Sequence, residues 1–323
     1  MPTSHHRYNK FQSQYGLIPA SDLADKHIIA SRMLQAIYRG EKSENAYCNM
    51  IDPLIHDPFL NFMRNRQLAN DAVTELAEIK SRKRLSDEDR LSLNLLSSQP
   101  LAFNLFLPLK WDNYKLATIV FQTLFPDLNI SAITKIKLEY VPGDEFLETR
   151  QKIDNSCFDV YLEYKNTKGE KCGMGFEVKY TESFSQSNFN KLEDTDSRKI
   201  RYKDVIKKYN NQFAENFEEY YLGPRYNQLF RNQLLTHLAM ENDQELTSCI
   251  QVVLHSANDT KCVTAIKGFD QLLLNKDAFR TITIEDFITA VKSKTSDQAL
   301  LDLYTSMYDR YCNYELVAKF LNE

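Results

Sequence analysis

Two short segments of alternating polarity, joined by a turn that contains glycine, constrain the fold of this chain more than any other feature. FDVYLEY spans residues 158–164, and GMGFEVKY spans residues 173–180. Alternation with a period of two is typical of strands. The linking sequence KNTKGEK predicts an antiparallel hairpin with the loop Thr167-Lys168-Gly169, because glycine tolerates the left-handed conformation that such three-residue loops need. This loop sets the register, and we expect Asp159 directly opposite Glu177.

Each strand of this hairpin is expected to have one apolar face and one face that carries charge. The apolar faces comprise Phe158, Val160, Leu162 and Tyr164 in the first strand and Met174, Phe176, Val178 and Tyr180 in the second. The charged faces comprise Asp159, Tyr161 and Glu163 in the first strand and Gly175, Glu177 and Lys179 in the second. Opposed side chains lie roughly 4.5–5.5 Å apart at Cβ, so Asp159 and Glu177 would repel each other.

A divalent cation would remove this repulsion by binding both carboxylates. Mg²⁺ typically binds one or two carboxylates and keeps several water molecules, which suits such a pair. Lys179 could then orient or deprotonate a water molecule, or stabilise charge on a phosphate. A surface cluster in which Lys179 neutralises both acids explains the same residues, and the spacing alone leaves both interpretations open.

The periodicity of the remaining chain predicts an α/β protein with helical additions at both ends. Helices are expected through most of residues 1–95 and then over residues 97–109, 112–125 and 226–238. Strands are expected over residues 134–141, 157–164, 172–180 and 248–255. The tail should hold a short strand near residues 279–282, a helix capped by Thr283 and a last helix from Ser296. The central order is therefore helix, three strands, helix, strand.

Composition excludes several classes of function. Only 8 glycines occur among the 323 residues, and neither GxGxxG nor GxxxxGK[ST] is present, which argues against P-loop and dinucleotide-binding enzymes. The six cysteines form no CxxC pair, and no His-x-x-x-His or G-x-S-x-G string occurs, which argues against metal–thiolate sites, zinc hydrolases and serine hydrolases. His237 lies on the apolar face of its helix and is expected in the core.

Charge and hydropathy indicate a protein without membrane contact. The N-terminal residues lack the apolar core of a signal peptide, and the richest apolar stretch, residues 116–125, is far too short for a membrane span. A cytoplasmic location is expected. With 40 Lys and Arg against 44 Asp and Glu, any contact with a nucleic acid must come from a local basic patch.

The charged hairpin residues resemble the signature of the PD-(D/E)XK nuclease superfamily. That signature places an Asp on one strand and Glu-x-Lys on the next, which Asp159 and Glu177-Val178-Lys179 match. Phe158 stands where the family pattern has proline. Four pieces in order, SSQPLAFNLFLPL, SCFDVYLEY, FEVKYTE and YNQLFRNQLL, resemble a bacterial group of predicted restriction endonucleases within that superfamily. The resemblance implies an α/β fold with a restriction-endonuclease-like α-β-β-β-α-β core of mixed sheet.

The resemblance also implies an activity and a site. It implies Mg²⁺-dependent hydrolysis of DNA, with Mn²⁺ as a possible substitute, by an endonuclease of restriction or defence type. Asp159, Glu177 and the Val178 carbonyl would hold the metal, and Lys179 would serve the attacking water. Further residues that it implies are Glu139 as an additional acid, Arg231 as a phosphate clamp, and Gln228, Asn232, Tyr180 and Glu182 as supports. Glu139 could equally face solvent, and Arg231 could equally pair with a surface carboxylate.

A basic segment after the hairpin is the best candidate for contact with DNA. SRKIRYKDVIKKY contains Arg198, Lys199, Arg201, Lys203, Lys207 and Lys208 against the single acid Asp204. Such a segment would give salt-dependent binding without sequence preference. A solvated charge run without a partner is the alternative.

The expected organisation is an N-terminal mainly helical region over residues 1–95, a nuclease core over 96–270 and a C-terminal helical extension over 271–323. A homodimer is attractive for cutting both DNA strands, and a partner methyltransferase or other defence protein is possible. The alternatives are a repair or structure-specific nuclease of the same fold, a non-catalytic nucleic-acid-binding or scaffold protein, and a helical interaction protein with an incidental hairpin.

Overall fold

The computed structural model describes residues 8–40, 49–51, 59–82, 88–142, 156–185, 187–209, 212–214, 220 and 222–322. The chain divides into two compact units. One unit comprises Met1–Trp111 together with Thr283–Glu323, and the other comprises Asp112–Ile282. Within the described residues, no helix is both long enough and apolar enough to cross a membrane.

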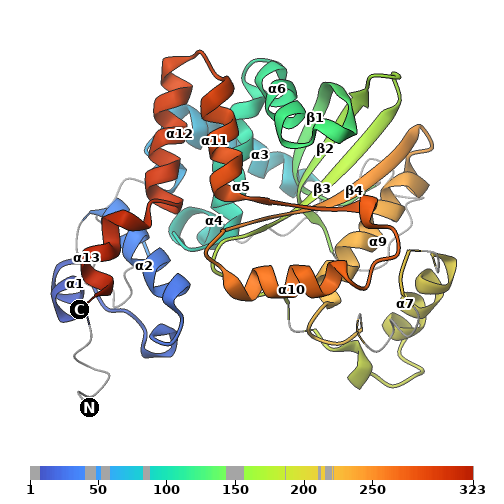
Figure 1. Ribbon diagram of the computed structural model, residues 1–323, viewed down its shortest axis with the longest axis horizontal. Helices are drawn as coiled ribbons and strands as arrows, with labels where there is room; N and C mark the ends of the chain where they lie inside the picture. Colours follow the sequence, from blue (N-terminus) through green and yellow to red (C-terminus); the bar gives the residue numbers. More distant parts are fainter. Residues whose placement is uncertain are drawn as a thin grey trace. The chain divides into compact units, whose positions relative to one another are not determined.

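The unit Asp112–Ile282 is built on a mixed sheet with the strand order β1-β2-β3-β4-β5 (Figure 1). The strands are β1 (Ile130–Tyr140), β2 (Phe158–Asn166), β3 (Lys171–Lys179), β4 (Leu246–His255) and β5 (Phe279–Thr283). β1 and β2 pair antiparallel, as do β2 and β3, whereas β3 and β4 are parallel. The helices of this unit include α6 (Lys115–Leu124), α7 (Ser197–Lys208), α9 (Asn227–Asn242) and α10 (Thr260–Asp270). The expected α/β class and mixed sheet are confirmed.

The hairpin between β2 and β3 has the predicted loop and register. The Gly169 N–H donates to the Asn166 carbonyl at 2.9 Å, and Gly169 has a φ of 81°, the left-handed conformation that the loop requires. Val160 pairs with Phe176, and Tyr161 pairs with Gly175. The first strand begins earlier than expected, at Ile130 rather than residue 134, because its pairing with β2 continues through two register irregularities.

Helices cover both faces of the sheet, so the unit has three layers. Phe121 of α6 contacts Phe176 edge-on at 5.9 Å between ring centroids, while Asn232 of α9 donates to Glu177 from the opposite face. Adjacent residues of a strand point to opposite faces, so α6 and α9 lie on different sides of β3. The face that carries the charged side chains is therefore covered by α9.

Phe158 departs from the expected alternation. Its ring stacks on Tyr161, with centroids 6.0 Å apart and planes at 11°, and it packs in the apolar cluster with α9 residues rather than on the Val160 face. The ring also covers Gly175, where an added Cβ would lie 2.1 Å from Phe158 Cε1. The expectation for this residue is wrong because the absent side chain at Gly175 leaves room for the ring on the charged face.

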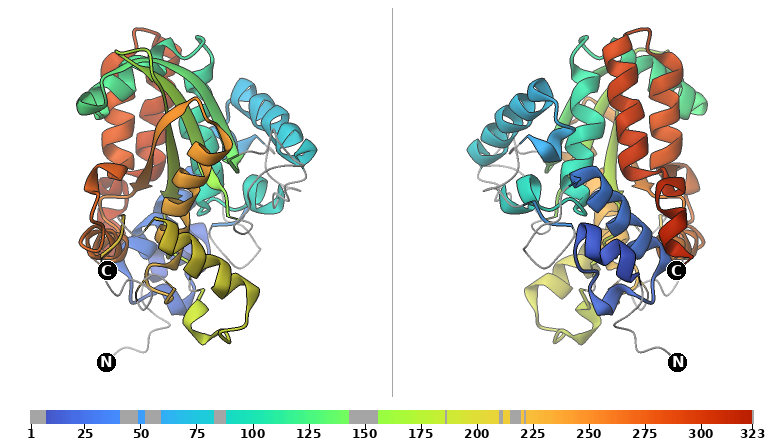
Figure 2. Two further views of the ribbon diagram at one scale, coloured as in Figure 1. Left: turned by 90° about the vertical axis from the view of Figure 1, so that its right-hand side faces the viewer. Right: turned by 90° about the vertical axis from the view of Figure 1, so that its left-hand side faces the viewer.

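The other unit is helical in its described part. Its helices are α1 (Asn9–Tyr15), α2 (Lys26–Arg39), α3 (Arg66–Ser81), α4 (Glu88–Leu93), α5 (Ser98–Phe106), α11 (Ile284–Lys294), α12 (Gln298–Tyr311) and α13 (Ala318–Leu321). The predicted cap of α11 is confirmed, because the Thr283 hydroxyl accepts a hydrogen bond from the Asp286 N–H at 3.0 Å. α11 and α12 lie side by side (Figure 2). Arg310 of α12 is buried and donates to Gln35 and Asn61.

Candidate active site

Asp159 lies at the start of β2 and reaches across to β3. Its Oδ2 accepts a hydrogen bond from the Val178 N–H at 2.7 Å, which places the carboxylate beside the Glu177-Val178-Lys179 segment. Burial, the charge of Glu177 and the charge of Glu139 raise the pKa of Asp159 well above its usual value, and Lys179 opposes them only in part. The ionised form of Asp159 therefore lacks sufficient positive charge nearby.

Glu177 is surrounded by donors. Its Oε1 accepts from Lys179 Nζ at 2.7 Å and from Gln228 Nε2 at 2.6 Å, and its Oε2 accepts from Asn232 Nδ2 at 2.5 Å. Glu177 is only 3% exposed and Lys179 only 6%. The alternative of a cluster on the protein surface is thus wrong, because α9 shields these side chains from solvent.

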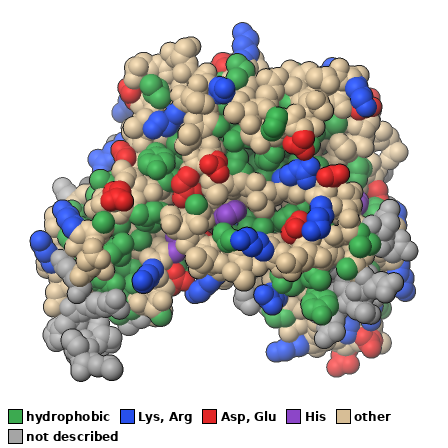
Figure 3. All heavy atoms as spheres, viewed as in Figure 1, with side chains coloured by type: hydrophobic (Ala, Val, Ile, Leu, Met, Phe, Trp, Pro, Cys, Tyr) green, Lys and Arg blue, Asp and Glu red, His purple; other side chains and the backbone are tan. Residues whose placement is uncertain are grey.

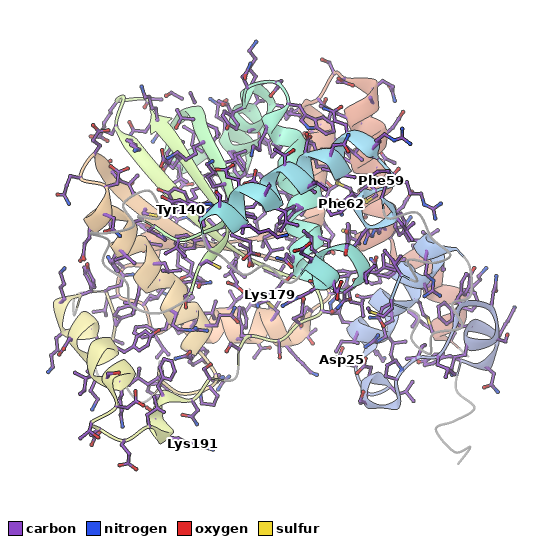
Figure 4. All side chains as sticks on the ribbon, turned by 180° about the vertical axis from the view of Figure 1, so that it is seen from behind. Asp25, Phe59, Phe62, Tyr140, Lys179 and Lys191 are labelled. Atoms are coloured by element: carbon purple, nitrogen blue, oxygen red, sulfur yellow. The ribbon has the colours of Figure 1, made fainter. Side chains whose placement is uncertain are left out.

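Lys179 ends β3 (labelled in Figure 4) and is held as a cation. Burial alone would lower its pKa, but the charges of Glu177 and Asp159 outweigh burial, and the pKa of Lys179 is raised above its ordinary value. Its Nζ also lies 3.3 Å from Gln228 Oε1 and 5.3 Å from the centroid of the Phe184 ring. In this arrangement Lys179 can orient a ligand or stabilise negative charge, whereas it would first have to lose a proton to act as a base.

Gln228, at the start of α9, connects three parts of the site. Its amide nitrogen donates to Glu177, and its amide oxygen accepts from Lys179 and from the Ser185 N–H at 2.6 Å. One side chain therefore ties the E-x-K strand to the helix above it and to the segment that follows the strand. Asn232 lies one helical turn further along and contacts the same carboxylate.

Other residues singled out from the sequence lie around this centre. Glu139 on β1 has a left-handed φ of 47° and accepts from the Cys157 thiol at 3.4 Å, and its charge acts on Asp159. Arg231 of α9 donates to Ser156 Oγ at 3.0 Å. Tyr180 is fully buried directly after Lys179. Glu182 is close enough for its charge to raise the pKa of Lys179.

His255 belongs to this edge of the sheet, although the sequence did not single it out. It ends β4, pairs in register with Lys179 and is 6% exposed, with Nδ1 3.0 Å from the Ser256 carbonyl oxygen. Parallel strands bring their carboxyl ends to one edge, where ligands of α/β proteins commonly bind. The sequence carries no local signal for His255, because the parallel pairing of β3 with β4 joins segments that lie far apart in the chain.

The basic segment forms α7, and its aromatic side chains face inward. Tyr202 is 1% exposed and packs against Phe189 and Phe230, while Tyr209 stacks on His237 with centroids 4.0 Å apart. Lysines on the outer side of α7 are paired with acids: Lys199 and Lys203 with Asp194, and Lys208 with Glu241. Lys207 is exposed, and the side chains of Arg198 and Arg201 lie outside the described part. Acidic and basic side chains are interspersed on the face drawn in Figure 3.

The residues at the hairpin fit a divalent cation by their chemistry. Within the part of the chain that the structure describes, no group of three or more His, Cys, Asp or Glu side chains is arranged to hold a metal ion. Asp159, Glu177 and the Val178 carbonyl nevertheless offer hard oxygen donors, and Mg²⁺ needs only one or two carboxylates. Burial and the repulsion from Glu177 and Glu139 raise the pKa of Asp159, and a bound cation would relieve that repulsion.

Comparison with known families agrees with the fold of the chain. The family model described as the PD-(D/E)XK nuclease superfamily matches residues 25–313. The chain belongs to the PD-(D/E)XK nuclease superfamily. The comparisons with curated proteins and with solved structures gave no significant match.

Proposed function

We propose that this protein is a Mg²⁺-dependent endonuclease that hydrolyses DNA phosphodiester bonds, of restriction or defence type and active in the bacterial cytoplasm. The observation that carries the proposal is the buried cluster in which Asp159, Glu177 and Lys179 meet at the end of the β2–β3 hairpin. Family membership supports a nuclease. The cluster supports a chemistry that needs two acids and one cation close together.

The proposed roles follow from the contacts of each residue. Asp159, Glu177 and the Val178 carbonyl would hold the cation, which when bound supplies positive charge to the scissile phosphate and lowers the pKa of water. Lys179, held 2.7 Å from Glu177, would orient the attacking water and stabilise charge on the phosphate. Gln228 and Asn232 would keep Glu177 in place.

Residues around the centre would complete the site. Glu139 would add negative charge beside Asp159 and strengthen cation binding. Arg231 would contact a phosphate, while Tyr180 and Glu182 would brace Lys179. The lysines of α7 would bind the DNA backbone without sequence preference. A homodimer would bring two such sites to the two DNA strands, and a partner methyltransferase would protect host DNA.

The proposal is tested by incubating plasmid and phage DNA with the protein in Mg²⁺, Mn²⁺ or EDTA. Lys179→Met removes the charge while it keeps most of the side-chain volume, and Lys168→Met at the exposed hairpin loop is the matched control. We expect cleavage that requires a divalent cation, survives in Lys168→Met and is lost in Lys179→Met. Cleavage that persists in EDTA, or in Lys179→Met, would contradict the proposed site. DNA binding without cleavage under every condition would instead favour a non-catalytic role.

A further inference from the structure

The outer face of α7 carries a carboxylate held between two lysines. Asp194, which precedes the helix, places its Oδ1 2.8 Å from Lys199 Nζ and 3.6 Å from Lys203 Nζ. Lys199 and Lys203 lie one helical turn apart and therefore project from the same side of α7. A single oxygen atom thus receives two ammonium groups, which is the arrangement that a phosphate oxygen would also satisfy.

Asp194 is more exposed to solvent than the two lysines that it contacts. The side chain of Asp194 is 82% exposed, whereas those of Lys199 and Lys203 are 13% and 33% exposed. Lys199 is further fixed by its hydrogen bond to the Leu192 carbonyl at 3.0 Å. The two lysine side chains are therefore the more buried partners, and Asp194 contacts them from the solvent side.

The helix that carries the lysines is anchored from beneath. Tyr202 and Ile206 are both 1% exposed and belong to the apolar cluster that includes Phe230 of α9. The lysine pair is therefore presented on a backbone that is fixed to the sheet-bearing unit. Asp194 lies outside the helix, so its side chain can swing away without disturbing this anchoring.

We propose that Asp194 occupies the position of a DNA backbone phosphate in the free protein and is displaced when DNA binds to Lys199 and Lys203. This inference rests on the proposed DNA function. It adds that Asp194 competes with DNA phosphate for the two lysines. Because Asp194 neutralises one of two positive charges, the lysine pair presents a net charge of about one to DNA, which limits binding without sequence preference. The low pKa of Asp194, caused by its hydrogen bond to and the charge of Lys199, keeps the competitor ionised.

The experiment compares binding of a short labelled DNA duplex in EDTA, over a series of salt concentrations, by wild type and three variants. Asp194→Asn removes the charge and keeps the shape, and Asp194→Glu keeps the charge. Glu193→Gln is the matched control, because Glu193 is the neighbouring exposed acid and has no ion-pair partner among the described residues. Each additional phosphate contact steepens the slope of log K against log salt by roughly 0.9.

We expect Asp194→Asn to bind the duplex about 3- to 10-fold more tightly at low salt, with a slope steeper by about one. Asp194→Glu should resemble the wild type, and Glu193→Gln should change affinity by less than about twofold. Equal effects of Asp194→Asn and Glu193→Gln would overturn the inference, because a general change in net charge would then be sufficient. Lack of an effect of Asp194→Asn would also overturn it.

The same measurement separates this inference from the proposed function. If DNA is cleaved in Mg²⁺ but Asp194→Asn binds like the wild type, only the role of Asp194 is wrong. If neither the wild type nor Asp194→Asn binds the duplex at low salt, the DNA interface on α7 is wrong as well. A far-ultraviolet circular dichroism spectrum of Asp194→Asn that matches the wild type shows that α7 is intact in the variant.

Discussion

Removal of the Gln228 side chain tests whether the site is held together in the way its contacts indicate. Its amide donates to the Glu177 carboxylate at 2.6 Å and accepts from the Ser185 N–H at 2.6 Å, with a longer contact of 3.3 Å to Lys179. Hydrogen bonds to charged groups contribute about 1.5–3 kcal/mol, and neutral ones contribute about 1 kcal/mol. We therefore expect Gln228→Ala to lower the free energy of unfolding by about 3 kcal/mol.

Urea unfolding of Gln228→Ala measures this change. The urea concentration at the unfolding midpoint should be lower for Gln228→Ala than for the wild type. The slope of the free energy of unfolding against urea concentration should be unchanged, because both proteins expose nearly the same area on unfolding. Gln244→Ala is the control, since Gln244 makes one exposed hydrogen bond to the Glu241 carbonyl and should matter by less than about 0.5 kcal/mol. Equal losses of stability in the two variants would refute the argument that Gln228 connects Glu177, Lys179 and Ser185.

Three further predictions concern Asp159, His237 and Gly175. The pKa of Asp159 is raised in the folded protein, so its ionised form destabilises the fold at any pH above the pKa of the unfolded chain. In EDTA at neutral pH, Asp159→Asn should therefore be at least as stable as the wild type. Added Mg²⁺ should raise the melting temperature of the wild type only. Burial and the charge of Lys208 lower the pKa of His237 to about 4. Neutral His237 should therefore contribute about 3 kcal/mol to the free energy of unfolding above pH 6.5, and this contribution should be lost as the pH falls toward 4. In urea titrations, His237→Phe should not show this pH-dependent loss. Gly175→Ala should lower the free energy of unfolding by about 3 kcal/mol, because the added methyl group clashes with Phe158. In a chain that also carries Phe158→Ala, the further loss caused by Gly175→Ala should be smaller. Losses that simply add would contradict this prediction.

The sequence was sufficient to predict the hairpin and its register because both are local properties. Three residues of loop, a glycine in the left-handed conformation and a period of two determine which side chains oppose one another. The side to which Phe158 turns could not be predicted in the same way. It depends on the space above Gly175, and that space exists only once β3 is paired with β2.

Burial of the charged face is a nonlocal property, which explains why the pattern alone left a surface cluster open. Glu177 and Lys179 look solvent-facing from the alternation of their strand, but α9 crosses above them and supplies amides from Gln228 and Asn232. The four-residue spacing of these two amides is visible in the sequence. The parallel pairing that brings His255 beside Lys179 is not, because it joins strands separated by a long connection.

The contrast between the two acids of the site favours a chemical role over a structural one. Buried ion pairs are often no more stabilising than apolar residues of similar size, so stability alone gives no reason to bury these two acids. Glu177 has donors on both oxygens. Among the described residues, Asp159 instead faces the negative charges of Glu177 and Glu139 and is favoured by the Val178 N–H and the charge of Lys179. A pair selected only for stability would distribute its donors more evenly. A bound cation would therefore relieve more repulsion at Asp159 than at Glu177. We predict that binding of Mg²⁺ would be detected first at Asp159.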